Sequence, residues 1–461
     1  MSRLQLITNR IKNIEPVKLI VLSFFVVIVL GTILLSLPIS CRDGETPRFI
    51  DSLFVATSST CVTGLTVFDT GSKWSFFGQF VILILTQVGG LGVISFTTGI
   101  TLFLRKRLGI RDLQIIKEYT NGSIVDIHGL IRSIFIVSFS CEALGALLLS
   151  IRFIPKFGPV GIWVSIFTAV SAYCNSGFDV MGILTPNISM VEYAKDPLVC
   201  VVIAFLVIIG GIGFIVITDV HNYFVNKYKN KAKSVKLGIH SIIVIYTSLI
   251  LLVVGTILFF LLENNNNLRG YNFWEGLNIS FFQSAVARTA GFFSIPIGKE
   301  KDITKIMTII LMFIGASPSS TGGGIKTTTF IVLIATVISV LKGYSNTCIR
   351  RHIIDKSTVY KTLSISTLAM MLVILFTSIV DLAEASKEFG TLNILFEIVS
   401  AFSTVGLTTG ITPFLGDLSK VIIIITMFVG RVGPVSLLFA LTVRHSKRIE
   451  TILPEGKVIV G

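Results

Sequence analysis

The chain has 461 residues, of which 52% are hydrophobic and only 14% are charged. Soluble domains carry about a quarter charged residues, so this composition excludes an ordinary soluble protein and indicates one that lies in lipid. The net charge of +14 does not indicate nucleic acid, because the termini and the loops around 105–132, 227–236 and 342–361 hold about twice as many Lys and Arg as the alternate loops, a bias that predicts cytoplasmic termini.

Eight long apolar runs follow one another along the chain, each suited to crossing about 30 Å of hydrocarbon. They lie near 17–37, 76–104, 131–151, 197–220, 239–262, 303–341, 362–381 and 419–443. The first run follows Arg3, Arg10 and Lys12 and could pass for a signal peptide. Its length and the lack of a small-residue cleavage pattern predict a retained span instead.

Four shorter segments of moderate hydrophobicity lie between the paired runs, at 50–62, 160–175, 273–289 and 391–404. They are too short to cross a bilayer, and a stretch of small residues and glycine follows each. We expect each segment to be a re-entrant pore helix. Its non-helical return would be tolerated only where protein buries it or where it lines a water-filled path.

The four returns repeat one another. Each contains a glycine, at Gly64, Gly177, Gly291 and Gly406, at nearly equal intervals along the chain. A phenylalanine precedes each glycine by the same distance, at positions 54, 167, 281 and 396. The repetition predicts an all-α membrane protein of four tandem span–pore-helix–span repeats, in which eight transmembrane helices and four pore helices surround one pseudo-fourfold pore.

Glycine in the returns suits a selectivity filter, because a backbone whose carbonyls aim at one axis needs φ values that a Cβ resists. The negative ends of the pore helices would point at the same axis and favour a cation. The alternative is that these glycines only allow close helix packing. The predicted filter consists of Val62, Thr63, Gly64, Asn175, Ser176, Gly177, Thr289, Ala290, Gly291, Thr404, Val405 and Gly406.

The run near 303–341 contains a stretch too rich in Gly, Ser and Pro to stay helical in lipid. At a similar distance after its own filter glycine, the fourth repeat carries Arg431 within a span, where an ionisable residue indicates function. We expect the stretch to form a loop whose carbonyls meet the guanidinium and obstruct the cytoplasmic side; the alternative is an arginine that only holds a broken helix together. The predicted gate consists of Gly315, Ala316, Ser317, Pro318, Ser319, Ser320, Thr321, Gly322, Gly323, Gly324, Lys326 and Arg431.

Other motifs have plainer interpretations. Residues 322–327 resemble a phosphate-binding loop, but Ile325 separates the glycines from the lysine and no strand precedes them. Residues 89–92 and 210–213 are interpreted as helix-packing glycines. Glu142 and Glu397 are expected to be hydrogen-bonded structural groups, the alternative being that either belongs to an ion route. Arg288 is expected to point away from the filter toward carbonyls or a carboxylate. The six cysteines have no metal-ligand spacing, so neither zinc nor disulfides are expected.

The four returns, the Gly-Ser-Pro-rich loop and the lone Arg431 resemble the membrane subunit of bacterial Ktr-type potassium uptake systems, in the superfamily that includes Trk and the plant HKT transporters. The resemblance covers essentially the whole chain. It implies that K⁺ is the main transported ion and binds at the four glycines, often with stimulation by sodium. It also implies a homodimer in the plasma membrane with one pore per subunit, and a cytosolic ring of nucleotide-binding, RCK-type regulatory subunits that controls the loop.

Within that family, glycine at the first return accompanies potassium permeation and serine accompanies sodium preference in plant members, so Gly64 implies potassium. No loop is long enough for a nucleotide-binding fold, so nucleotide control would come from another chain. A secondary transporter or symporter for sodium or another monovalent cation is the alternative, but four units running in one direction favour a fixed filter. No nucleophile with a base and no metal cluster indicates an enzyme.

The expected organisation follows the repeats. The resemblance places the C-terminal tail at the dimer interface. The segments are a cytoplasmic N-terminus (1–16), repeat 1 (17–104), a cytoplasmic linker (105–130), repeat 2 (131–223), a linker (224–237), repeat 3 (238–342) with the intramembrane loop 315–326, a linker (343–358), repeat 4 (359–443) and a cytoplasmic tail (444–461).

Overall fold

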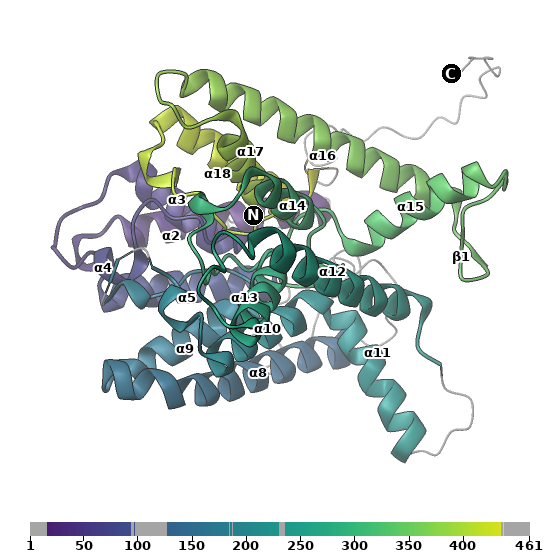
Figure 1. Cartoon of the computed structure of the whole chain (residues 1–461), viewed down its shortest axis with the longest axis horizontal. Helices are drawn as coiled ribbons and strands as arrows, with labels where there is room; N and C mark the ends of the chain where they lie inside the picture. Colours follow the sequence, from purple (N-terminus) through teal and green to yellow (C-terminus); the bar gives the residue numbers. More distant parts are fainter. Residues whose placement is uncertain are drawn as a thin grey trace, which may run out of the picture.

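The computed structural model describes residues 16–93, 96, 127–183, 185, 186, 188–229, 236–434 and 437. The expected N-terminus up to residue 15, most of the 105–130 linker, part of the 224–237 linker and the 444–461 tail lie outside the described residues. The described part is mostly helical. Its only paired strands are β1 (Cys348–Ile349) and β2 (His352–Ile353), which form a short antiparallel hairpin at the far end of α15 (Thr327–Leu341) (Figure 1).

In the described ranges, four helices are long and apolar enough to cross a membrane on their own. Their outer faces expose large apolar side chains such as Phe25, Leu147 and Leu261, as expected of surfaces that contact lipid. The four are α2 (Pro16–Leu35), α8 (Ile127–Phe157), α12 (Ile239–Glu263) and α16 (Lys356–Ala383).

A shorter and largely buried helix follows each long one. These helices begin and end close to the segments expected from the sequence. Of the phenylalanines that mark the repeat, Phe54, Phe167 and Phe396 are fully buried and Phe281 is partly buried. The four helices are α3 (Phe49–Cys61), α9 (Val160–Tyr173), α13 (Phe273–Val286) and α17 (Thr391–Phe402).

The second helices of the first, second and fourth units end before the predicted apolar runs do, and that of the third unit ends just before the expected loop. Gly92, Gly213 and Gly433 end three of them with φ values of 82°, 98° and 91°, which a residue with a Cβ rarely adopts. The backbone therefore turns at these glycines, and the apolar runs near 76–104, 197–220 and 419–443 do not form single uninterrupted helices. The four are α5 (Phe76–Leu91), α10 (Pro197–Ile212), α14 (Asp302–Phe313) and α18 (Asp417–Val432).

Of the four second helices, only α10 is followed directly by another described helix, α11 (Phe214–Phe224). Gly213 lies between the two, and the chain bends there by 94°. If this bent pair counts as one span, five spans rather than eight meet the length and hydropathy of a membrane crossing in the described part of the chain. Short helical turns complete the fold: η1 (Pro38–Ser40), α4 (Thr70–Lys73), η2 (Met181–Ile183), η3 (Val191–Tyr193), η4 (Val225–Lys229), η5 (Ile297–Lys299) and η6 (Thr412–Phe414).

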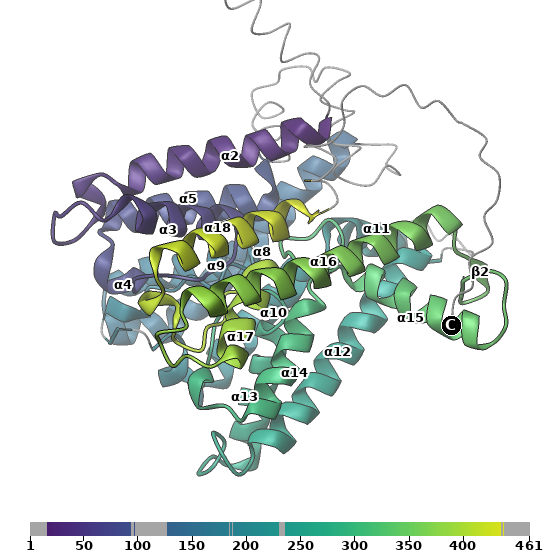
Figure 2. The same ribbon diagram turned by 90° about the horizontal axis from the view of Figure 1, so that it is seen from above.

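The helices pack in a cyclic order. Each short helix contacts the long helix before it, as α3 does with α2 and α9 does with α8. Each second helix then contacts the short helix of the following unit: α5 with α9, α10 with α13, α14 with α17, and α18 with α3. Because the last of these contacts returns to the start of the chain, the short helices are enclosed, and Figure 2 shows α3 and α18 side by side.

Two glutamates set the entry angle of second helices. Glu263, at the end of α12, accepts hydrogen bonds from the backbone of Lys301 (3.1 Å) and the hydroxyl of Thr304 (2.5 Å) at the start of α14. Glu384, just after α16, does the same for Gly416 (2.6 Å) and Ser419 (2.5 Å) at the start of α18. Each carboxylate satisfies N-terminal donors that the helix itself cannot.

Candidate functional site

The chain reverses after each short helix through a left-handed backbone turn. Val62, Asn175, Thr289 and Thr404 have φ values of 59°, 58°, 84° and 50°, although none is a glycine. Two residues later Gly64, Gly177, Gly291 and Gly406 have φ values of 90°, 71°, 71° and 92°. Such backbone costs about 1–3 kcal/mol for each non-glycine residue and persists where the surroundings enforce it, as at functional sites.

The four glycines of the returns lie against one another in a closed ring. A Cβ added to any one of them would collide with the carbonyl oxygen of the next return. The distances would be 2.1 Å from Gly64 to Ser176, 2.5 Å from Gly177 to Ala290, 2.5 Å from Gly291 to Val405 and 2.1 Å from Gly406 to Thr63. The structure thus brings together the twelve residues predicted for a filter, from four places far apart in the sequence.

Serines at the ends of the short helices hold these turns. The hydroxyl of Ser58 accepts a hydrogen bond from the backbone of Gly64 at 3.1 Å, and that of Ser400 accepts one from Gly406 at 3.1 Å. In the second unit Ser171 donates to the carbonyl of Phe178 at 2.6 Å. Sequence reasoning missed these serines, although three of the four returns carry one at the same distance before the glycine.

Glu397 holds the segment after the fourth return. Its side chain is buried in α17, where one oxygen accepts from the hydroxyl of Thr408 (2.5 Å) and the backbone of Thr409 (3.0 Å). The other oxygen accepts from the hydroxyl of Thr412 at 2.9 Å. The structural interpretation of Glu397 therefore agrees with its contacts.

A cavity of about 790 Å³ lies over the ring, and all four glycines line it. Asp69 and Asp179 line it as well, together with Lys73 and Lys299. Burial and then the Asp69 carboxylate raise the pKa of Asp179 to about 6, against hydrogen bonds from Met181 and Ser189 that lower it. This cavity, which we call the vestibule, therefore has a carboxyl group that can change charge near neutral pH.

The predicted intramembrane loop lies on the opposite side of the ring. It connects α14 to α15, and a backbone bridge between Ile314 and Ile325 closes its base. A Cβ added to Gly322 would lie 2.2 Å from the hydroxyl of Thr289, and one on Gly323 would lie 2.3 Å from that of Thr404. The loop is therefore packed directly against the third and fourth returns.

The bent α10–α11 pair anchors the loop. The backbone of Ser317 donates to the carbonyl of Gly211 at 3.0 Å, and that of Thr321 donates to Gly210 at 3.3 Å. Beyond the bend, the backbone of Phe214 donates to the carbonyl of Ser319 at 2.9 Å. The 94° bend thus supplies the groups that hold the loop in place.

Arg431 joins three separated segments. One guanidinium nitrogen donates to the carbonyl of Thr321 in the loop, and the other donates to Gly89 near the end of α5 and, at 3.4 Å, to Gly90. Lys326 donates to the carbonyl of Gly322 at 2.7 Å. Both cations therefore bind backbone oxygens beneath the ring, as positively charged groups inside a membrane protein must be paired to be tolerated.

The structure also bears on the predictions for the helix-packing glycines and for Arg288. Gly89 and Gly210 pack closely on the carbonyls of Thr60 and Tyr173, which agrees with the helix-packing interpretation. That interpretation is wrong for Gly92 and Gly213, which break their helices. The prediction for Arg288 is confirmed, because its guanidinium donates to the carbonyl and hydroxyl of Ser248 in α12.

A closed ring of four backbone turns inside a bundle of apolar helices, with the loop 315–326 packed against one side, indicates a membrane transport protein. Residues 14–450 match the family model described as cation transport protein, TrkH. The chain is 38% identical in sequence to Ktr system potassium uptake protein B of Bacillus subtilis (strain 168), and the alignment covers 97% of both chains. The chain therefore belongs to the TrkH family of cation transport proteins, with the Ktr-type membrane subunits.

Two further comparisons agree with this membership. The chain is 36% identical to potassium/sodium uptake protein NtpJ of Enterococcus hirae, over 98% of both chains. Its fold is similar to the crystal structure of the potassium transporter TrkH from Vibrio parahaemolyticus, with a TM-score of 0.69 at 17% identity, covering 91% of this chain and 84% of that one.

Proposed function

We propose that the chain takes up potassium across the cell membrane through a channel-like pore. The closed ring of four glycine turns is the observation that carries this proposal, because each return abuts the carbonyl of the next. Carbonyl oxygens around one axis can replace the hydration shell of a monovalent cation. The names of the Bacillus subtilis and Enterococcus hirae relatives support potassium as the ion, and the latter favours sodium as a second one.

The proposed pore is formed by four span–pore-helix–span repeats, with the twelve residues of the returns as its filter and K⁺ at Gly64, Gly177, Gly291 and Gly406. The short helices point the negative C-terminal ends of their dipoles toward the ion; these helices are α3, α9, α13 and α17. Only the glycines are common to all four returns. One coordination layer is therefore well formed, and the layers built by Val62, Asn175, Thr289 and Thr404 are chemically mixed.

We propose that the loop 315–326 and Arg431 form the gate. Arg431, in α18, contacts Thr321 of the loop and Gly89 of α5. The guanidinium therefore connects the loop to both helices. Opening requires these bonds and those from α10 to break together. An arginine that only stabilises the broken helix would have the same contacts, so flux through Arg431 variants separates the two roles.

Release of the loop requires free energy to break its contacts with α10 and Arg431. We propose that a cytosolic ring of nucleotide-binding subunits supplies it, and that the chain works as a homodimer with both termini in the cytoplasm. Similarity to named components of Ktr systems supports a partner subunit.

The experiment is uptake of ⁸⁶Rb⁺ and ²²Na⁺ into liposomes that contain the purified chain, with and without its cytosolic partner. The variant Gly406→Asp should abolish flux, because its side chain would occupy the space beside Thr63. Gly270→Ala is the matched control, since Gly270 has a φ of 92° but nothing within 4 Å of an added Cβ. Flux of fixed stoichiometry with a driving ion would instead favour a secondary transporter, and equal flux in Gly406→Asp would contradict the pore.

A further inference from the structure

A second cavity, of about 400 Å³, is separate from the vestibule and shares no lining residue with it. Helices α5, α8 and α9 line it with almost entirely apolar side chains. Ile84, Phe139 and Ile166 at its rim are 45%, 51% and 40% exposed, on faces that would contact lipid. The volume lies within the range of pockets that hold small ligands, and the lining would accept a hydrocarbon chain.

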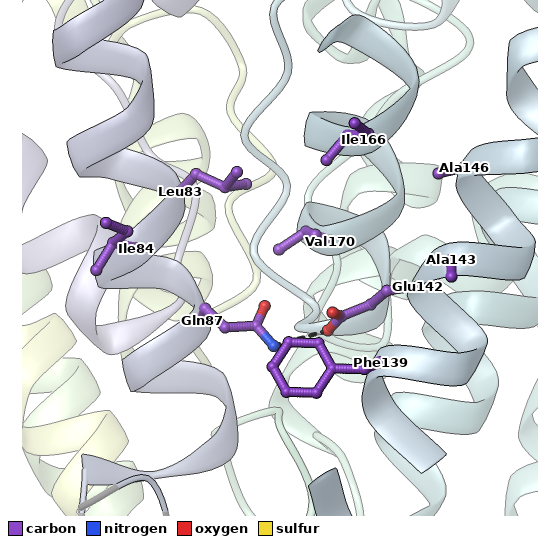
Figure 3. A pocket seen from close by; sticks show the side chains of 9 residues that line it. All are labelled: Leu83, Ile84, Gln87, Phe139, Glu142, Ala143, Ala146, Ile166 and Val170. Carbon is purple, nitrogen blue, oxygen red and sulfur yellow. Dashed lines mark hydrogen bonds between the residues drawn. The ribbon is translucent and has the colours of Figure 1, made fainter. Parts of the chain in front are cut away.

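One carboxyl group reaches the floor of this lateral pocket. Glu142, 5% exposed in the middle of α8, has one hydrogen-bond partner in the described part of the chain: Gln87 of α5, whose amide nitrogen lies 2.9 Å from Oε1. Oε2 accepts no hydrogen bond from any described residue, and Glu142 is one of the residues that line the pocket. Figure 3 shows the two side chains pointing toward each other, with the ring of Phe139 beside them.

The chemistry of the pocket selects its ligand. Among the residues that the structure describes, no Lys or Arg lines it, so a phosphate or a fatty-acid carboxylate would meet Glu142 without a counter-charge. A plain hydrocarbon would leave Oε2 without a donor, which costs free energy in an apolar site. An alkylammonium ion supplies both the charge and the donor, and the ring of Phe139 can add a cation–π contact. We infer that the lateral pocket binds a membrane-dissolved hydrophobic amine, with the ammonium group on Glu142 and the alkyl chain along the apolar wall.

The pocket is connected to the second return. The amide oxygen of Gln87 accepts a hydrogen bond from the thiol of Cys174 at 3.5 Å, and Cys174 directly precedes Asn175. An ammonium ion on Oε2 of Glu142 draws negative charge from the carboxylate, so Oε1 becomes a weaker acceptor for Gln87 and this connection loosens. On the proposed function, the amine therefore alters potassium flux from the lipid side without entering the pore.

The test is equilibrium binding of radiolabelled dodecylamine to the purified chain in nanodiscs of neutral phosphatidylcholine. Saturable binding of one amine per chain is expected, with at least tenfold weaker binding to Glu142→Gln. Ala146→Phe fills the pocket and should abolish binding; Leu147→Phe, on the exposed face of the same helix, is the matched control and should bind as the parent does. Dodecanol and dodecanoate have the same tail and should not compete.

Binding that does not saturate, that dodecanol displaces equally, or that survives both Glu142→Gln and Ala146→Phe would overturn the inference. Variants are compared only when they elute as single species in gel filtration. Glu142→Gln removes the charge and Ala146→Phe fills the space, so if one variant misfolds the other still tests the site. ⁸⁶Rb⁺ uptake with dodecylamine is measured separately. Saturable amine binding to a chain that transports nothing would contradict the proposed function and leave the amine site supported. Normal uptake by a chain that binds no amine would contradict the amine site and leave the proposed function supported.

Discussion

The Nζ atom of Lys420, in the first turn of α18, lies 2.7 Å from Oδ1 of Asp51 in α3, and both side chains are almost completely buried. The pair joins the last second helix to the first short helix. Lys305 occupies the same place in α14 and reaches Asn393 of α17 at 3.1 Å. One lysine position thus connects each of these second helices to the short helix of the following unit.

Replacing Lys420 by Met should lower the free energy of unfolding by about 1.5–3 kcal/mol, because the buried Asp51 carboxylate loses a charged hydrogen-bond donor and keeps the exposed Arg48. Lys305→Met is the matched control and should cost about 1 kcal/mol, since its partners are the neutral amide of Asn393 and the exposed carboxylate of Asp302 at 3.7 Å. Thermal unfolding in detergent measures both. Lys420→Met combined with Asp51→Asn should recover part of the loss; no recovery would show that the charge is not the cause.

Gly64→Ser should reduce potassium uptake at least tenfold and raise sodium uptake relative to it. The added Cβ would lie 2.1 Å from the carbonyl of Ser176 and so displaces an oxygen of the ring. The ratio of ⁸⁶Rb⁺ to ²²Na⁺ uptake measures the change, with Gly270→Ala as the control for backbone strain. An unchanged ratio of ⁸⁶Rb⁺ to ²²Na⁺ uptake would contradict a role for Gly64 in selectivity.

Arg431→Ala should increase potassium flux several-fold in the absence of the cytosolic partner, because the loop then loses its bonds to α18 and α5. Deletion of residues 317–322 should act in the same direction, since it removes Thr321 and the anchors on α10. Uptake is normalised to protein reconstituted. If Arg431→Ala conducts no faster than the parent while folded, the arginine stabilises the break in the helices and does not gate.

Acidifying the vestibule side should slow uptake. The pKa of Asp179 is about 6, so its carboxylate is mostly charged at pH 7.5 and mostly protonated at pH 5, where it no longer attracts K⁺. Asp179→Asn should have the lower rate at pH 7.5 and lose most of the dependence between these values. Uptake measured at low ionic strength is the readout, and a parent rate independent of pH would contradict a role for this carboxyl.

Local features of the fold could be predicted from the sequence. The short helices lie within a few residues of the predicted segments, because apolar composition and the following glycine mark both ends. The breaks at Gly92, Gly213 and Gly433 could not be distinguished from packing glycines. Both kinds of glycine occur in apolar helices, and only the backbone angle separates them.

The contacts of the candidate site depend on which units are neighbours, and that order is a property of the folded chain. The sequence predicts that Arg431 meets carbonyls of the loop, and the structure places it on Thr321. It does not predict that α5 supplies the other acceptor at Gly89. The pairing of Lys420 with Asp51 was missed for the same reason, although both residues are unusual for buried positions.

The ring of glycine turns has a consequence for the biogenesis of the protein. Its closing contact joins Gly406 to Thr63, so the first turn has no neighbour on that side until the last unit has left the ribosome. At ordinary rates of synthesis this interval is on the order of tens of seconds. During that time the left-handed backbone at Val62 has its own helix, α5 and the second return to enforce it, and a nascent chain truncated before the fourth unit cannot close the ring.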